Sequence, residues 1–134
     1  MTVQTLLAFD YGRRRIGVAV GQTLTQSARP LAVLKISKNK QIPWQQIQQY
    51  IAEWQPHALV LGLSQHADGS QNKITQAIHD FKAELEQRYN LPVYLVDETL
   101  TSVAAHEYLE EIGQKEAFID AVAAKMILET WLKG

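Results

Sequence analysis

Three acidic residues stand where an apolar segment gives way to a turn or a helix. Asp10 ends the first apolar run, Glu98 follows the last one, and Asp120 lies near the start of the final helical segment. Each alone has an ordinary explanation, because acids in turns and at helix starts interact with local backbone groups. Without thiolates or close histidine pairs, the three together suit hard cations such as Mg²⁺ or Mn²⁺, which can activate water for phosphodiester hydrolysis. The residues alone therefore indicate a candidate metal–carboxylate site, and no more.

Further polar side chains belong to the same expected edge of the protein. Asp97 precedes Glu98, while His66 and Asp68 lie in a polar loop after a buried apolar run. In sheets built from βαβ units, ligands bind outside the carboxyl ends of the strands. These three residues are therefore additional candidates for the site.

Arg13, Arg14 and Arg15 form a compact basic patch in the short link between the first two apolar runs. Such a patch could contact phosphate groups of a nucleic acid. A solvated turn explains it equally well. The neighbouring glycines do not have the spacing of a dinucleotide-binding fingerprint.

The elements that must position these residues follow from the hydrophobic pattern. Five apolar runs predict strands, of which the first two form a hairpin: Thr5–Tyr11, Ile16–Val20, Pro30–Ile36, Ala58–Leu63 and Pro92–Val96. Apolar stripes at helical spacing predict two helices: one opens at Pro43 and is stopped by Pro56, and the next is capped by Ser70 and runs to about Leu85. Two more helices are expected, from a cap at Thr101 or Ser102 to about Ile112 and from about Gln114 to Leu132. Pro30 is expected at the start of its strand, where a missing N–H does least harm.

The predicted order is β-β-β-α-β-α-β-α-α. It indicates an α/β fold with a mixed five-stranded sheet and helices on both faces. The length of 134 residues predicts a single domain over 1–134.

Composition narrows the range of functions. Hydrophobic residues make up 46% of the chain, enough for a core, and the absence of cysteine excludes disulfides, thiolate zinc sites and cysteine nucleophiles. A formal net charge of −1 argues against a general nucleic-acid coat protein, but it allows an enzyme that binds nucleic acid at one local patch. No apolar run approaches the ~20 residues of a membrane span, and no basic leader is evident, so we expect a cytoplasmic protein with no membrane partner.

Four stretches of the sequence resemble a known family. They are LAFDYGRRRIGVAVGQ (Leu7–Gln22), VLGLSQHADGS (Val60–Ser70), VYLVDETLTSVAA (Val93–Ala105) and IDAVAAKMILETWL (Ile119–Leu132). They are similar to the YqgF family, also called RuvX, of pre-16S rRNA nucleases. The first and third stretches are highly specific together, and the resemblance covers nearly the whole chain.

The resemblance implies a ribonuclease H-like fold related to the RuvC resolvase. It also implies hydrolysis with one or two Mg²⁺ or Mn²⁺ ions, which matures the 5′ end of 16S ribosomal RNA during ribosome biogenesis. Asp10 matches the first-strand Asp of the family, Glu98 the Glu of its DER-type motif, and Asp120 the Asp of its last helix. These three are therefore the expected catalytic residues and metal ligands.

The chain departs from the family pattern at three positions. Ser64 replaces a usual Pro, Thr99 a basic residue, and Phe118 a Lys. Two basic groups near the carboxylates are thereby lost, and Lys115 or the arginine link is expected to supply substrate grip in their place.

Other functions stay open at this point. One is a resolvase acting on a four-way DNA junction, which a homodimer with two facing sites would favour. Another is a non-catalytic RNA-binding factor in ribosome assembly, with which the near-neutral charge agrees. An actin-like phosphotransferase is disfavoured because the chain is too short for a second lobe. The expected partner is nucleic acid, either pre-16S rRNA or structured DNA, and the protein could be a monomer or a homodimer.

Overall fold

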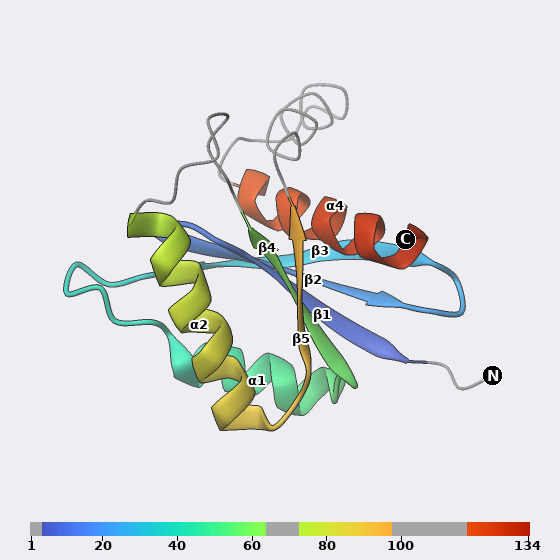
Figure 1. The fold of residues 1–134 in the computed structure, drawn as a ribbon, viewed down its shortest axis with the longest axis horizontal. Helices are drawn as coiled ribbons and strands as arrows, with labels where there is room; N and C mark the ends of the chain where they lie inside the picture. The colour runs from blue at the N-terminus through green and yellow to red at the C-terminus, as the bar shows by residue number, and fades with distance from the viewer. Residues whose placement is uncertain (1–3, 64–72, 98–117) are drawn as a thin grey trace.

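The computed structural model describes residues 4–63, 73–97 and 118–134 (Figure 1). Its elements in chain order are β1 (Thr5–Tyr11), β2 (Arg15–Gln22), β3 (Ser27–Lys35), α1 (Trp44–Trp54), β4 (Ala58–Leu63), α2 (Lys73–Tyr89), β5 (Val93–Asp97) and α4 (Ile119–Lys133). The helix expected from Thr101 to Ile112 and the expected cap at Ser70 lie outside the described residues.

The five strands form one mixed sheet in the order β3-β2-β1-β4-β5. The β1–β2 and β2–β3 pairs are antiparallel, whereas β1–β4 and β4–β5 are parallel. Parallel neighbours require crossover connections, and α1 and α2 supply helices for them. The carboxyl ends of β1, β4 and β5 therefore share one edge of the sheet with the start of β2 and the end of β3. We call it the carboxyl edge.

Helices cover both faces of the sheet, as the sequence predicted. Figure 1 shows α1 and α2 on one face and α4 on the other. Alternation along β1 divides its side chains between the two layers: Leu7 and Phe9 join the core under α1 and α2, while Leu6 and Ala8 pack with Ile127 of α4. Every second residue of β1 therefore faces α4, which fixes the direction of the acid at its end.

Helix α4 approaches the sheet closely because the strand beneath it presents glycine. A Cβ atom on Gly17 would lie 1.8 Å from the backbone oxygen of Asp120, and one on Gly21 would lie 2.8 Å from a methyl carbon of Leu128. Only the missing side chains leave room for the helix axis at this distance. Gly17 thus sets the position of the first turn of α4.

The structure corrects several boundary predictions. Strand β2 is longer than expected, β5 is shifted by one residue to Val93–Asp97, and α2 ends at Tyr89 rather than at about Leu85. Pro30 was expected at the start of its strand, but β3 begins at Ser27 and Pro30 lies within it, paired with Ala19. The strand tolerates proline there because β3 is an edge strand and its register shifts beside this pair. Pro43 was expected as the first helical residue, but it is the N-cap that precedes α1. Strands β1 and β4 have the predicted bounds.

Candidate active site and basic hollow at the carboxyl edge

Asp10 occupies the penultimate position of β1, at the carboxyl edge. It is half-buried and faces Gly17 across the β1–β2 ladder. Directly opposed residues in an antiparallel pair point to the same face of the sheet. Asp10 therefore shares a face with Leu6, Ala8 and helix α4.

Asp120 reaches the same place from α4. It lies in the first turn of that helix, and its backbone carbonyl packs against Gly17, the ladder partner of Asp10. A glycine at position 17 thus joins the two acids, because one pairs with it and the other packs on it. The structure brings Asp10 and Asp120 to one face of one edge.

The environment of the Asp120 carboxylate is unusual for an acid whose only role is to interact with the N-terminus of a helix. Its Oδ2 atom lies 2.9 Å from Nε of Arg15, and its side chain is 20% exposed. Despite this short separation the oxygen is buried and receives no hydrogen bond from the described residues, because the contact lacks hydrogen-bond geometry. Helix-dipole complementation accounts for an acid at this position. It does not account for a buried oxygen that has an ion-pair partner but accepts no hydrogen bond from the described residues, because an unmade hydrogen bond at a buried acceptor is costly.

The other predicted site residues divide into two groups. Asp97 is described, and its ladder partner Leu63 packs in the core under α1 and α2. Alternation therefore places Asp97 on the face opposite Asp10 and Asp120. Glu98, His66, Asp68 and Lys115 lie outside the described residues. Among those that are described, no three metal-ligating side chains form a group.

A hollow of about 660 Å³ adjoins the Asp120 side of the edge. Six cationic residues line it, and we call it the basic hollow: Arg13, Arg14, Arg15, Lys35, Lys38 and Lys40. The three predicted arginines thus do gather on one surface. The three lysines were missed by the sequence interpretation, although their spacing in the segment Lys35–Lys40 was visible. What brings them to the arginines is the β2–β3 register, in which Arg15 pairs with Lys35.

Tyr11 follows Asp10 but points to the other face, where it packs against Phe81. Burial raises the pKa of the Tyr11 hydroxyl above its usual value of 10.0, and the charge of Asp80 raises it further. Tyr11 therefore stays a neutral hydroxyl at neutral pH, so it cannot serve there as a general base.

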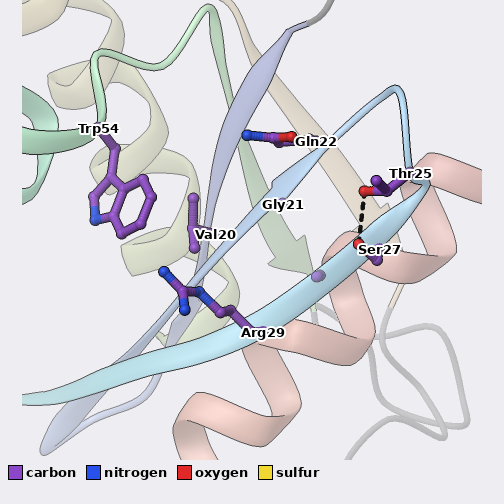
Figure 2. Close-up of a pocket in the computed structure, with 8 residues that line it drawn as sticks. Val20, Gly21, Gln22, Thr25, Ser27, Arg29 and Trp54 are labelled. Carbon is purple, nitrogen blue, oxygen red and sulfur yellow. Dashed lines mark hydrogen bonds between the residues drawn. The ribbon is translucent and has the colours of Figure 1, made fainter.

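A second hollow, of about 310 Å³, lies at the opposite end of β2 (Figure 2). Trp54 and Arg29 line it together, with the guanidinium 5.2 Å from the ring centroid. Thr25 and Ser27 line it too and share a hydrogen bond of 2.7 Å. No described carboxylate lines this hollow, so it lacks the groups that hydrolysis with a hard cation would need.

The strand order and the helical layers define a ribonuclease H-like fold. In solved structures the same fold occurs in *T. thermophilus* RuvC bound to a Holliday junction substrate, with a TM-score of 0.59 and 19% identity over 96% of this chain and 93% of that one. The fowlpox virus Holliday junction resolvase matches with a TM-score of 0.57 and 15% identity over 96% and 98%.

The sequence matches the family RuvX, described as Holliday junction resolvase, over residues 4–134. Two relatives carry the name "Putative pre-16S rRNA nuclease". That of *Paraburkholderia xenovorans* is 44% identical over 97% of this chain and 88% of its own length, and that of *Dechloromonas aromatica* is 44% identical over 97% and 91%. The chain belongs to the RuvX family and is a nuclease, a hydrolase of phosphodiester bonds. No helix in the described ranges is long and apolar enough to cross a membrane.

Proposed function

We propose that this nuclease depends on a divalent metal and matures the 5′ end of 16S ribosomal RNA in the cytoplasm, as a single domain. The names of its relatives support the substrate. The observation that carries the active site is the meeting of Asp10 and Asp120 on one face of the carboxyl edge, through Gly17.

The carboxylates present fit a hard divalent cation. Asp120 offers a buried anionic oxygen that accepts no hydrogen bond from the described residues and already attracts a positive charge. Oxygen ligands of this kind are those that Mg²⁺ and Mn²⁺ prefer. Within β5, Tyr94 stacks on Trp131 of α4 and Val96 packs with the core under that helix, so even-numbered residues face α4. Glu98 directly follows this strand in the sequence and matches the Glu of the family motif, so we propose it as the third ligand.

Each acid has its own task in this proposal. Asp10 is held by the β-ladder and Asp120 by a helix packed on glycine, so both offer their oxygens from rigid elements. Glu98 completes the set and orients the attacking water. When bound, the metal supplies Lewis-acid stabilisation of the phosphodiester and a water of lowered pKa.

Cleavage by the wild-type protein tests the proposed substrate. The protein is incubated with Mg²⁺ or Mn²⁺ and a 5′-extended 16S precursor, and in parallel with a four-way DNA junction. Metal-dependent shortening of the precursor at its 5′ end supports the proposal. RNA binding without cleavage of either substrate would instead favour a non-catalytic assembly factor.

Cleavage of the junction alone would move the assignment to a resolvase. The family description and the likeness of the fold to RuvC favour this second candidate. Because a symmetric junction calls for two facing sites, that outcome also predicts a homodimer in sedimentation analysis.

Metal binding should raise thermal stability. At about ten times the dissociation constant, a ligand that binds only the folded state adds about 1.4 kcal/mol, so we expect Mg²⁺ to raise Tm by about 5 °C. Differential scanning calorimetry measures the shift. KCl at equal ionic strength and the Asp10→Asn/Asp120→Asn double variant are the controls. An unchanged Tm at millimolar Mg²⁺ would contradict the proposed metal site.

A further inference from the structure

The basic hollow contains more positive charge than the fold itself requires. Six of the 13 lysines and arginines of the chain line it, although the formal net charge of the whole protein is −1. Within the described residues, Arg15 is the one member of the six that forms an ion pair with a carboxylate. The described lining of the hollow contains no acid. The charge there is therefore segregated rather than balanced.

One pair in the hollow opposes stability. Arg15 and Lys35 are direct partners across the β2–β3 ladder, and both are exposed. Like charges directly opposite one another destabilise a sheet. An anion bound between the two side chains would neutralise this repulsion. The pair is therefore better explained by anion binding than by a contribution to stability.

The walls of the hollow are fixed by the backbone. The Ile36 amide donates a hydrogen bond of 2.9 Å to the Arg14 carbonyl, which ties the lysine segment to the arginine link. Beyond it, the Lys40 amide donates to the Ser37 carbonyl at 2.8 Å, and the Gln41 amide donates to the Ser37 hydroxyl at 3.1 Å. The cations thus project from a preformed frame, which lowers the entropy lost when an anion binds.

The hollow also adjoins the acids directly. Arg15 lines it and at the same time lies 2.9 Å from the Asp120 carboxylate. A polyanion held in the hollow would therefore extend to the edge where Asp10 and Asp120 meet. We propose that the basic hollow binds the sugar–phosphate backbone of the substrate nucleic acid beside the scissile phosphate. The identity of this polyanion rests on the proposed function, whereas the location of the binding surface rests on the hollow alone.

Binding without cleavage tests the proposal. Anisotropy of a fluorescein-labelled RNA from the 16S precursor leader is followed in EDTA as the salt concentration is varied, and the labelled four-way DNA junction is used in parallel. We compare Lys35→Gln/Lys38→Gln with Lys82→Gln/Lys133→Gln, which removes two charges from α2 and α4 outside the hollow. The hollow variant should bind about tenfold more weakly than the control, and its salt slope should fall by about two. Equal affinities and slopes for the two variants would overturn the proposal.

Two further readouts separate a binding role from a structural one. Lys35→Gln alone should raise Tm at low salt while weakening RNA binding, since it relieves the repulsion from Arg15. In cleavage assays the hollow variant should show a raised KM with kcat largely retained. Hollow-dependent binding in a protein that never cleaves would refute the proposed nuclease but keep the binding surface. Cleavage with an unchanged KM in the hollow variant would refute the surface and keep the nuclease.

Discussion

Asp10→Asn is expected to lower metal-dependent cleavage by about a thousandfold, because it removes the charge of one of the three proposed metal ligands. The amide has nearly the same shape as the carboxylate, and Asp10 sits within a paired strand, so the fold should persist. Single-turnover cleavage of the precursor in saturating Mg²⁺ measures the loss. Circular dichroism and Tm verify that the variant is folded.

Asp97→Asn is the matched comparison for this experiment. It makes the same chemical change at the same edge, two strands away, but on the opposite face of the sheet. We expect it to keep most of the wild-type rate. If Asp10→Asn and Asp97→Asn lower the cleavage rate equally, the face of the sheet on which an acid lies does not matter for activity. The proposed site would then be wrong.

Gly17→Ala should damage both the fold and the site. Its new methyl group would fall 1.8 Å from the Asp120 carbonyl oxygen and 2.8 Å from the Ala121 nitrogen, both of them backbone atoms. Backbone cannot move aside as a flexible side chain does, so α4 must shift away from β2. We expect the free energy of unfolding to fall by about 2 to 3 kcal/mol, and the stabilisation by Mg²⁺ to shrink as Asp120 moves. Urea denaturation with and without Mg²⁺ measures both.

Gly21→Ala separates the two effects. It adds the same methyl group to the same strand and face, but against Leu128 and the Ser27 carbonyl rather than against Asp120. It should lower stability while leaving the increment from Mg²⁺ near the wild-type value. If Gly17→Ala keeps the full increment as well, the packing of α4 on Gly17 does not position the metal ligands.

The sequence was most informative where local pattern and tertiary environment agree. β1 and β4 had their predicted bounds because each is a short apolar run next to a residue that interrupts regular structure, Gly12 after β1 and Pro56 before β4. β2 extends further than predicted, from Arg15 to Gln22. Its ends are polar or glycine, and only pairing with both neighbours keeps them in the sheet. Such pairing is a property of the assembled sheet and leaves no trace in hydrophobic periodicity.

The candidate site was predictable in its residue types but not in its connections. Asp10 and Asp120 were recognised as acids at element ends, yet nothing in their spacing indicated that Gly17 would join them. The contact between Arg15 and Asp120 and the lysines of the basic hollow depend likewise on helix packing and strand register. Asp97 was a candidate because it precedes Glu98 in the sequence. Alternation along β5 places Asp97 on the face of the sheet opposite Asp10 and Asp120.

The segregation of charge gives the whole molecule an electrostatic polarity. Outside the basic hollow, seven basic residues remain against 14 acidic ones, which leaves the rest of the chain with a formal charge of −7. A nucleic acid approaching from a distance is therefore repelled by most of the surface and drawn to one end. Long-range fields of this kind turn a protein during its approach and speed productive encounters, and they weaken steeply with ionic strength. The same repulsion should also weaken nonspecific binding of nucleic acid elsewhere on the protein, so that a cleaved product is not held there.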